Sequence, residues 1–542
     1  MVRPLALALL LFSLPVLAKP PRLALFITVD ALGSDLLLRT RPKFKSGMRQ
    51  LLDGGAFYPY GRFDYAKPRT APGHTTLSTG ANPWRHGIVD NKVVDRTTGQ
   101  SVSVFRDEAR PVLEVPMSVA TGGDTSPLNL MAETLGDRLR MGSRGRGKVV
   151  ALSGKGRSAI AMAGRLGQAY WFDETVGKFV TGTWYTKEFP GWLKAFNSRG
   201  LADGYFSQQW TQLLPKTEYL GEDERPYETD DTGMGVSFPH PLSGGVQTAG
   251  PRSYEALASS PFSNDLLVQA AKAALEGEAM GKDEVPDLLA VSFSGTDRVF
   301  HSYGPYSWEM QDALYRLDRS LAELVTAAER AAGGRANLVI VLTADHGGAA
   351  VPEHWASEGL PARRMNPKEL AKGLAQALNA RFPQVEVTVT QEESDVYLTG
   401  KALEEGKADG AAVRRAAAEW MSKQQGIAAA VARDDLFTAP DVGGLLGPVR
   451  RGYYPGRSGD VLIVPQPFQV ISTAMSGTNH GTPYSYDQQV PVVFAGKGVK
   501  PGTYLQEIHA TDVAPTLAAM LELGAPASSE GRPRTEFFTN GR

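Results

Sequence analysis

Residues Asn337–Gly348 read NLVIVLTADHGG, an apolar run that stops at Asp345 and His346 and continues into two glycines. The run has no clean alternation of apolar and polar side chains, which is typical of a strand buried on both faces of a sheet. Further apolar runs that end in polar residues lie at 22–29, 148–152, 286–293 and 489–495. The sequence therefore predicts several buried strands with polar side chains beyond their ends.

Helical periodicity lies between these runs. Trp308–Ala332 is a long amphipathic stretch with a leucine stripe, and shorter helical patterns cover 264–280 and 512–523. Alternating strands and helices predict an α/β fold, an α/β/α sandwich around a mostly parallel sheet with helices on both faces. In such sheets functional residues gather beyond the carboxyl ends of the strands.

Two long segments interrupt the alternation. Residues from about 159 to 262 are rich in Trp, Tyr, Gly and Pro, and residues from about 350 to 475 mix helical patterns with short strand patterns. Neither segment contains an obvious parallel-sheet repeat. We interpret both as insertions that cap the sheet within one catalytic domain, residues 19–542.

The first 18 residues resemble a cleaved signal peptide. A basic start precedes an apolar run that is too short to span a bilayer, and Val16-Leu17-Ala18 offers small residues for cleavage. A signal-anchor is the alternative. No later stretch is long and apolar enough for a membrane helix, so we expect no stable membrane anchor and a periplasmic or secreted protein.

Composition narrows the class of partner and ligand. The formal net charge is −1, which gives no reason to expect nucleic acid or an acidic membrane as a partner. The chain has no cysteine, which is compatible with a bacterial periplasm and leaves Asp, Glu and His as metal ligands. The sequence does not set the oligomeric state, and a monomer is compatible with it.

Six Asp and His residues stand at or near the predicted strand ends. They provide three carboxylates and three imidazoles: Asp30, Asp297, His301, Asp345, His346 and His480. Asp297 and His301 alone could be a surface pair one helical turn apart, but the whole set is enough for two zinc ions. Two metals about 4 Å apart can serve in-line phosphoryl transfer.

Residues Arg69–Thr76, RTAPGHTT, resemble the start of a helix. Pro72 suits the first turn, and Thr70 would then lie beside free backbone N–H groups and the positive end of the helix dipole. Such a place suits a phosphate, and Thr70 could complete one metal shell. An ordinary helix cap is the alternative.

Several motifs together resemble the alkaline phosphatase superfamily. They are TAPGHTTLSTG, HGIVDN, SFSGTDRVFHSYG, VLTADHGG and NHGTPYSYDQQVPVVFAG, in the order in which that superfamily carries them. The chain is most similar to its type I phosphodiesterase/nucleotide pyrophosphatase-like branch with a threonine nucleophile. The resemblance covers nearly the whole mature chain and implies an alkaline-phosphatase-like fold.

The resemblance also assigns roles. It implies that Thr70 forms a covalent phosphothreonine and that Asn91 and the Ala71 N–H bind a phosphoryl oxygen. It implies two Zn²⁺ ions per chain in two ligand sets. One set is Asp297, His301 and His480, and the other is Asp30, Asp345 and His346.

Lys155 and Arg157 resemble the Lys-x-Arg pair of the periplasmic phosphate monoesterases in this branch, which its diesterases lack. Two zinc ions balance three aspartates and a Thr70 alkoxide, so this pair leaves a positive site suited to a dianionic monoester. We therefore expect a zinc-dependent alkaline phosphatase acting on small phosphate monoesters.

The alternatives are a phosphodiesterase or nucleotide pyrophosphatase on the same site, and a catalytically silent zinc- or phosphate-binding protein. A sulfatase is disfavoured because there is no cysteine to become formylglycine.

Overall fold

A nine-stranded, mostly parallel sheet forms the centre of the computed structural model, which describes residues 19–116 and 123–539. The predicted signal peptide, residues 1–18, lies outside the described residues. The strand order is β19, β2, β18, β11, β1, β10, β5, β6, β7. The strands are β1 (Leu23–Val29), β2 (Ala56–Arg62), β5 (Val149–Ser153), β6 (Gln168–Asp173), β7 (Lys178–Val180), β10 (Asp287–Phe293), β11 (Leu338–Thr343), β18 (Gln489–Gly496) and β19 (Gly502–Thr503).

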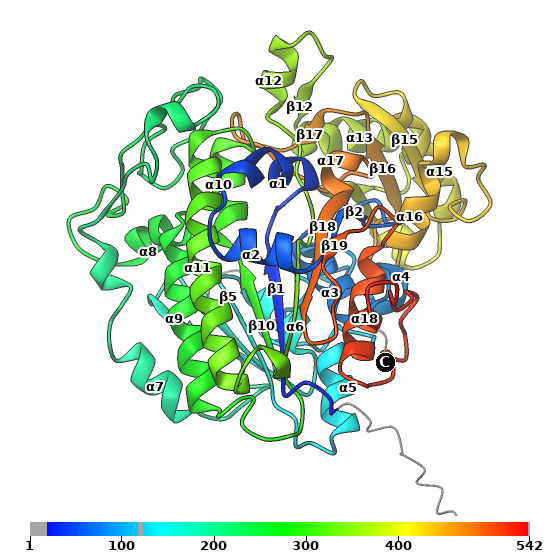
Figure 1. The fold of residues 1–542 in the computed structure, drawn as a ribbon. Coiled ribbons are helices and arrows are strands. Elements are labelled where there is room, and N and C mark those ends of the chain that lie inside the picture. The colour runs from blue at the N-terminus through cyan, green and yellow to red at the C-terminus, as the bar shows by residue number, and fades with distance from the viewer. Residues whose placement is uncertain (1–18, 117–122, 540–542) are drawn as a thin grey trace, which may run out of the picture.

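Helices cover both faces of this sheet, so the predicted α/β/α sandwich is confirmed (Figure 1). On one face lie α2 (Gly47–Gly54), α9 (Phe262–Gly277) and α11 (Trp308–Ala332). On the other lie α3 (Thr70–Thr79), α5 (Leu135–Gly142), α6 (Gly156–Ala163) and α18 (Val513–Met520). β1, β10 and β11 are buried along their whole length, as the unbroken apolar runs predicted.

The long helix α11 shows how the sequence determines where a helix begins, where it ends and which face is buried. The Ser307 side chain accepts a hydrogen bond from the Met310 N–H at the helix start, and Gly333 takes a left-handed conformation just after its end. The leucine stripe on the helix is at most 1% exposed and belongs to the central core. Burying that stripe, rather than helix propensity, accounts for most of the stability of such a helix.

The parallel register brings the polar strand ends to one edge of the sheet. Thr28 in β1 is opposite Thr343 in β11, and Val29 is opposite Phe293 in β10. Ser292 in turn is opposite Ser153 in β5. The residues that follow these four strands therefore leave the sheet at the same level. That edge carries the candidate site.

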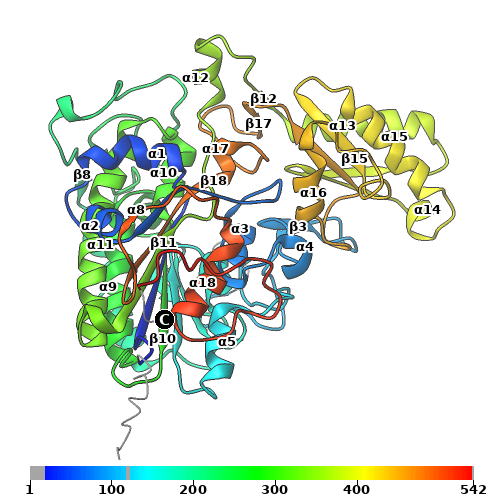
Figure 2. The same ribbon diagram turned by 45° about the vertical axis from the view of Figure 1, so that its right-hand side comes forward.

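The second predicted insertion forms a projecting unit (Figure 2). Its four-stranded sheet has the order β13, β14, β16, β15 and its own hydrophobic cluster. The elements are β13 (Thr388–Glu392), β14 (Asp395–Thr399), β15 (Ile427–Ala432), β16 (Val461–Pro465), α13 (Pro367–Arg381) and α15 (Gly410–Ser422). We call residues 366–465 the cap. A short parallel pair, β12 (Arg363–Met365) and β17 (Gln469–Ile471), lies at its base.

The first predicted insertion begins later than expected. We expected it from about residue 159, but α6 packs on the central sheet and β6 pairs in parallel with β5. β7 then extends the same sheet in antiparallel fashion. Residues 156–180 therefore belong to the core. The rest of the segment carries α7 (Gly191–Asn197), β8 (Gln209–Trp210), β9 (His240–Pro241) and α8 (Pro251–Ala258).

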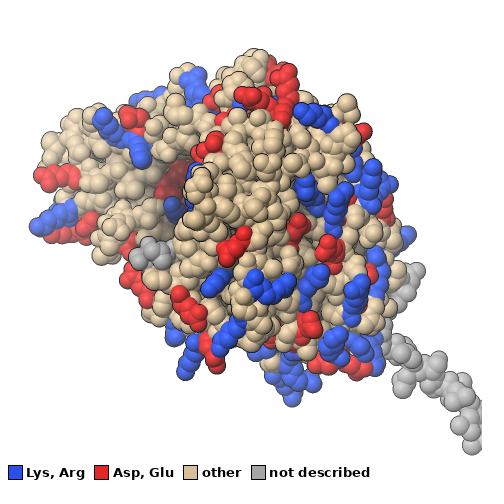
Figure 3. All heavy atoms as spheres, turned by 90° about the vertical axis from the view of Figure 1, so that its left-hand side faces the viewer, with Lys and Arg blue, Asp and Glu red and all other residues tan. Residues whose placement is uncertain are grey.

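The surface agrees with the near-neutral sequence. Figure 3 shows a face on which Lys and Arg are interspersed with Asp and Glu. Across residues 19–116 and 123–539, no helix has the length and apolar character needed to cross a membrane.

Candidate active site

The predicted nucleophile stands at the start of a buried helix. Thr70 is the first residue of α3, and the preceding Arg69 is extended. The Ala71 N–H donates to Asn91 Oδ1 over 2.8 Å, so this side chain lies over the helix N-terminus. Gly73 allows the helix to approach the segment of the predicted ligand Asp345, since a Cβ there would lie 2.3 Å from the Asp345 carbonyl oxygen.

The structure brings the six predicted ligands together in two clusters. One is Asp297, His301 and His480, and the other is Asp30, Asp345 and His346. In each cluster one ligand atom per residue lies within 4.8 Å of the others. These are the two sets that the resemblance implied.

The three imidazoles are oriented alike. Each Nδ1–H donates to a backbone carbonyl: His301 to Thr478 at 2.9 Å, His346 to Gly347 at 2.8 Å and His480 to Pro68 at 3.2 Å. A carbonyl can only accept, so each ring carries a proton on Nδ1 and turns Nε2 toward a carboxylate of its cluster. The Nε2 atoms of His301 and His346 lie 3.3 Å from Asp297 Oδ1 and Asp30 Oδ1, and that of His480 lies 3.7 Å from Asp297 Oδ1. This arrangement prepares a histidine to bind a metal through Nε2.

Several buried atoms of the two clusters have no hydrogen-bond partner, and they indicate which kind of ligand the clusters could hold. Among the described residues, Asp30 Oδ1, Asp297 Oδ1, Asp345 Oδ2 and His346 Nε2 are buried and lack a hydrogen-bond partner. Leaving such groups unsatisfied is costly, and metal ligation would satisfy them. A donor set of imidazole nitrogen and carboxylate oxygen suits Zn²⁺. The residues therefore fit two metal ions.

Lys155 joins the two clusters. Its Nζ lies 2.7 Å from Asp30 Oδ2 and also contacts Asp297 Oδ2, while its side chain is only 10% exposed. Burial alone would lower the pKa of Lys155, but the carboxylates of Asp297 and Asp30 raise it. Burial and the carboxylate of Asp297 raise the pKa of Asp30. The centre thus concentrates negative charge that cations must balance.

Arg157 is held by a residue that sequence reasoning missed. Its backbone N–H donates to Asp124 Oδ2 over 3.0 Å, and its Nε lies 3.4 Å from the same oxygen. Asp124 also accepts from the Ser103 hydroxyl and is 1% exposed. No apolar run or ligand spacing marks Asp124 in the sequence, so pattern reasoning had no means of finding it.

The histidines that we did not assign as ligands have other partners. His74 binds the Thr70 carbonyl through Nδ1 at 2.8 Å and the Ser292 hydroxyl through Nε2 at 2.7 Å, which ties α3 to β10. His86 Nδ1 accepts from the Ile88 N–H at 3.1 Å. His74 therefore contacts the backbone of Thr70 directly, whereas His86 holds the loop that follows it.

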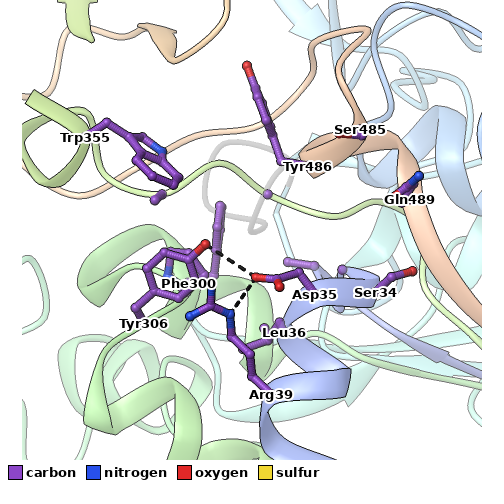
Figure 4. A pocket seen from close by; sticks show the side chains of 15 residues that line it. Ser34, Asp35, Leu36, Arg39, Phe300, Tyr306, Trp355, Ser485, Tyr486 and Gln489 are labelled. Carbon is purple, nitrogen blue, oxygen red and sulfur yellow. Dashed lines mark hydrogen bonds and ion pairs between the residues drawn. The ribbon is translucent and has the colours of Figure 1, made fainter. Parts of the chain in front are cut away.

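A cavity of about 270 Å³ is lined by Ala31 and Phe300, which are next to the cluster residues Asp30 and His301 in the chain (Figure 4). The ring of Phe300 also contacts the rings of His301 and His480. At its rim the Asp35 carboxylate accepts from Arg39 Nε at 2.8 Å. Because these two charges satisfy each other, the pair offers no unbalanced charge to select a ligand.

With this geometry, the family can be stated. The chain belongs to the type I phosphodiesterase/nucleotide pyrophosphatase family, whose profile matches residues 24–484. It is 32% identical to the alkaline phosphatase PafA of Elizabethkingia meningoseptica, over 96% of this chain and 94% of PafA. It is equally identical to the alkaline phosphatase PhoV of Synechococcus elongatus, over 96% of this chain and 93% of PhoV.

A Myroides odoratus protein named a calcium-transporting ATPase is 32% identical, over 97% of both chains. The crystal structure of PafA superposes with a TM-score of 0.87 at 31% identity and covers 96% of this chain and 99% of PafA. The predicted alkaline-phosphatase-like fold is therefore confirmed.

Proposed function

We propose that this protein is an alkaline phosphatase that hydrolyses phosphate monoesters, with Thr70 as nucleophile. The observation that carries the proposal is the meeting of two Asp/His clusters with one lysine beside the N-terminus of α3. Relatives named alkaline phosphatase, at 32% identity over nearly the full length, support it.

The two clusters would hold two Zn²⁺ per chain. When bound, these ions supply Lewis-acid stabilisation of the attacking and leaving oxygens in an in-line displacement. Asp297, His301 and His480 would hold one ion, and Asp30, Asp345 and His346 the other, with Thr70 completing one shell. The Nε2 atoms, which face the carboxylates of their clusters, and the carboxylate oxygens without hydrogen-bond partners support this assignment.

The reaction divides into two displacements at phosphorus. The Thr70 Oγ1–P bond forms while the bond from phosphorus to the leaving oxygen breaks, which gives phosphothreonine and an alcohol. Water then cleaves the phosphothreonine to inorganic phosphate and restores the hydroxyl. Asn91 and the Ala71 N–H would bind a phosphoryl oxygen at the N-terminus of α3, and the Ala71 N–H would give up its hydrogen bond to Asn91 Oδ1 to do so.

Lys155 and Arg157 would select monoesters over diesters. Lys155 Nζ lies between the clusters, where a phosphoryl group that spans them brings its oxygens. A monoester presents three such oxygens and two negative charges, whereas a diester uses one oxygen for its second ester. One solved PafA structure is of a variant with a threonine, an asparagine, a lysine and an arginine replaced. The threonine–asparagine and lysine–arginine separations equal those of Thr70 to Asn91 and Lys155 to Arg157.

We also propose that the protein is exported to the periplasm or the medium. This proposal rests on the N-terminal sequence and the absence of cysteine. Such an enzyme would act on small-molecule phosphate esters outside the cytoplasm.

The test compares four substrates with metal-replete protein: an aryl phosphate monoester, an aryl phosphodiester, an aryl sulfate and ATP. We expect the highest kcat/KM on the monoester, loss of activity with a chelator and recovery with Zn²⁺. A preference for the diester would establish a phosphodiesterase, and a preference for ATP would support the name of the Myroides relative. Inactivity on all four, with metal bound, would establish a silent binding protein.

A further inference from the structure

Two basic side chains that precede Thr70 are buried in the protein. The side chains of Lys67 and Arg69 are 10% and 7% exposed. Lys67 Nζ contacts Asp395 and lies 3.3 Å from Asp90 Oδ2, and Arg69 Nε lies 3.5 Å from Asp90 Oδ1. Buried charges of this kind need partners, and here part of the pairing comes from the cap, through Asp395 at the start of β14.

Glu393, also in the cap, contacts two segments of the site at once. Its Oε2 lies 3.1 Å from Arg69 Nη2, next to the nucleophile. Both of its carboxylate oxygens also accept from Asn479 Nδ2 at 3.4 Å. Asn479 Oδ1 in turn accepts from the backbone N–H of the predicted metal ligand His480 at 2.9 Å. One carboxylate therefore connects the nucleophile segment to a metal-ligand segment.

Arg69 contacts the metal-ligand segment directly as well. Its guanidinium packs against Gly481, where a Cβ would lie only 2.6 Å from Arg69 Nε. The arginine is thus held between Gly481 on one side and the carboxylates of Glu393 and Asp90 on the other. A shift of this guanidinium would disturb the residue before Thr70 and the residue after His480 together.

Glu393 has a left-handed backbone conformation that glutamate seldom adopts, which indicates that its side chain is needed at this position. Residues 393 and 394 form the two-residue connection between β13 and β14, and Glu393 has a φ of 52°. Gly, Asn or Asp is the usual residue for a left-handed position in such a turn. A glutamate there is uncommon, and its contacts with Arg69 and Asn479 give it a function that glycine could not supply.

We propose that Glu393 is a positioning residue, supplied by the cap, that fixes the spacing between Thr70 and the His480 metal site. The inference rests on the proposed phosphatase function and deepens it. Nucleophilic attack depends strongly on this spacing, since a misplacement of about 1 Å can cost about a hundredfold in rate. The cap is therefore part of the catalytic geometry rather than only a wall of the cleft.

The alternative is that Glu393 only holds the cap to the body. Glu392 provides a matched control, because it is the adjacent residue on the same hairpin. Its Oε2 accepts from the Ser101 hydroxyl at 2.6 Å and thereby also joins the cap to the body. Among the described residues Glu392 makes no hydrogen bond or ion pair with Arg69 or Asn479, and its charge acts on Arg69 more weakly than that of Glu393. It therefore shares the structural role without the contacts that the proposed positioning role needs.

The experiment measures kcat and KM on an aryl phosphate monoester for wild type, Glu393→Gln, Glu393→Ala and Glu392→Ala. Rates are expressed per folded, zinc-loaded molecule, and melting temperatures are recorded. We expect Glu393→Ala to lower kcat about a hundredfold with KM changed less than about threefold. Glu393→Gln keeps the shape of the side chain but removes the negative charge that is paired with Arg69, and should lower kcat about tenfold. Glu392→Ala should match wild type.

The inference is overturned if both Glu393 variants keep the wild-type kcat per zinc-loaded molecule, or if Glu392→Ala loses as much as Glu393→Ala. If Glu393→Ala does not fold, Glu393→Gln decides alone, because it is nearly isosteric. Failure of the phosphatase proposal itself would be distinct, since wild type would then have no monoesterase activity to lose.

Discussion

The imidazole ring of His346 stacks on that of His480, with centroids 3.6 Å apart and planes 12° from parallel. The two residues belong to different ligand clusters. The stack puts one ring of each cluster in direct contact with a ring of the other. We therefore expect a change at either histidine to affect both proposed metal sites.

Removal of His480 tests that coupling. His480→Ala should lower bound zinc from about two ions to about one or fewer per chain and abolish most turnover, because it removes a ligand and the ring that supports His346. The measurement is zinc content by atomic emission after dialysis against a weak chelator. His354→Ala is the control, because His354 lies in neither cluster. Full metal content in His480→Ala would contradict the assignment.

Removal of the nucleophile should separate chemistry from folding. We expect Thr70→Ala to lose about 10⁴-fold or more in kcat while it stays folded and keeps its zinc, because the covalent step has no other acceptor. Mass spectrometry of acid-quenched wild type should find phosphate on Thr70. Thr75→Ala, a change in the same helix, is the control and should still carry phosphate on Thr70 after acid quenching. Near-normal turnover of Thr70→Ala would exclude the mechanism.

Lys155 and Arg157 should control the choice of substrate. Each charge-assisted contact in a desolvated site contributes about 1.5–3 kcal/mol, roughly ten- to a hundredfold in rate. The change Lys155→Ala with Arg157→Ala should therefore lower kcat/KM on an aryl monoester by several orders of magnitude, and on a diester much less. The measurement is kcat/KM for both substrates with wild type and the double variant, which gives the preference for monoester over diester in each protein. Equal losses would show that the pair supports only the fold or a shared contact.

Gly73 should tolerate no side chain. An added Cβ would lie 2.3 Å from the Asp345 carbonyl oxygen, and backbone cannot move aside as a flexible side chain can. Gly73→Ala should therefore push α3 away from the ligand segment and lower the free energy of unfolding by about 1–3 kcal/mol. Urea unfolding and kcat report the two effects. Gly191→Ala, where nothing lies within 4 Å of the added Cβ, should be neutral.

His509 gives a pH dependence of stability away from the metal clusters. Its Nδ1 lies 2.9 Å from Asp64 Oδ1, and this hydrogen bond raises the pKa of His509. The contribution should be complete below about pH 6.5, the ordinary histidine value, and be lost as the pH rises through the raised pKa. Wild type should exceed His509→Gln in unfolding free energy by no more than about 1 kcal/mol at pH 6. An equal difference at pH 6 and pH 9 would contradict this.

The fold and the ligands could be predicted because they depend on local patterns. A buried parallel strand such as β11 is an unbroken apolar run, and the residue after it must lie at the carboxyl edge. β6 was missed because its sequence, QAYWFD, lies in an aromatic-rich segment without such a run. Contacts such as that of Glu393 with Arg69 join residues far apart in the sequence. Their pairing depends on how the cap packs, which no local pattern records.

The central position of β1 also decides when the chain can fold. β1 is the first strand to be synthesised, yet both of its neighbours, β10 and β11, come from the second half of the chain. Such long-range pairing is slow, because a large loop must close before the contacts that reward it form. Both edges of β1 stay unpaired until Phe293 has emerged, and one edge stays unpaired until Thr343 has emerged. Molecular chaperones would therefore have most to shield in the first half of the chain, and the two Asp/His clusters can form only after the chain has been synthesised as far as His480.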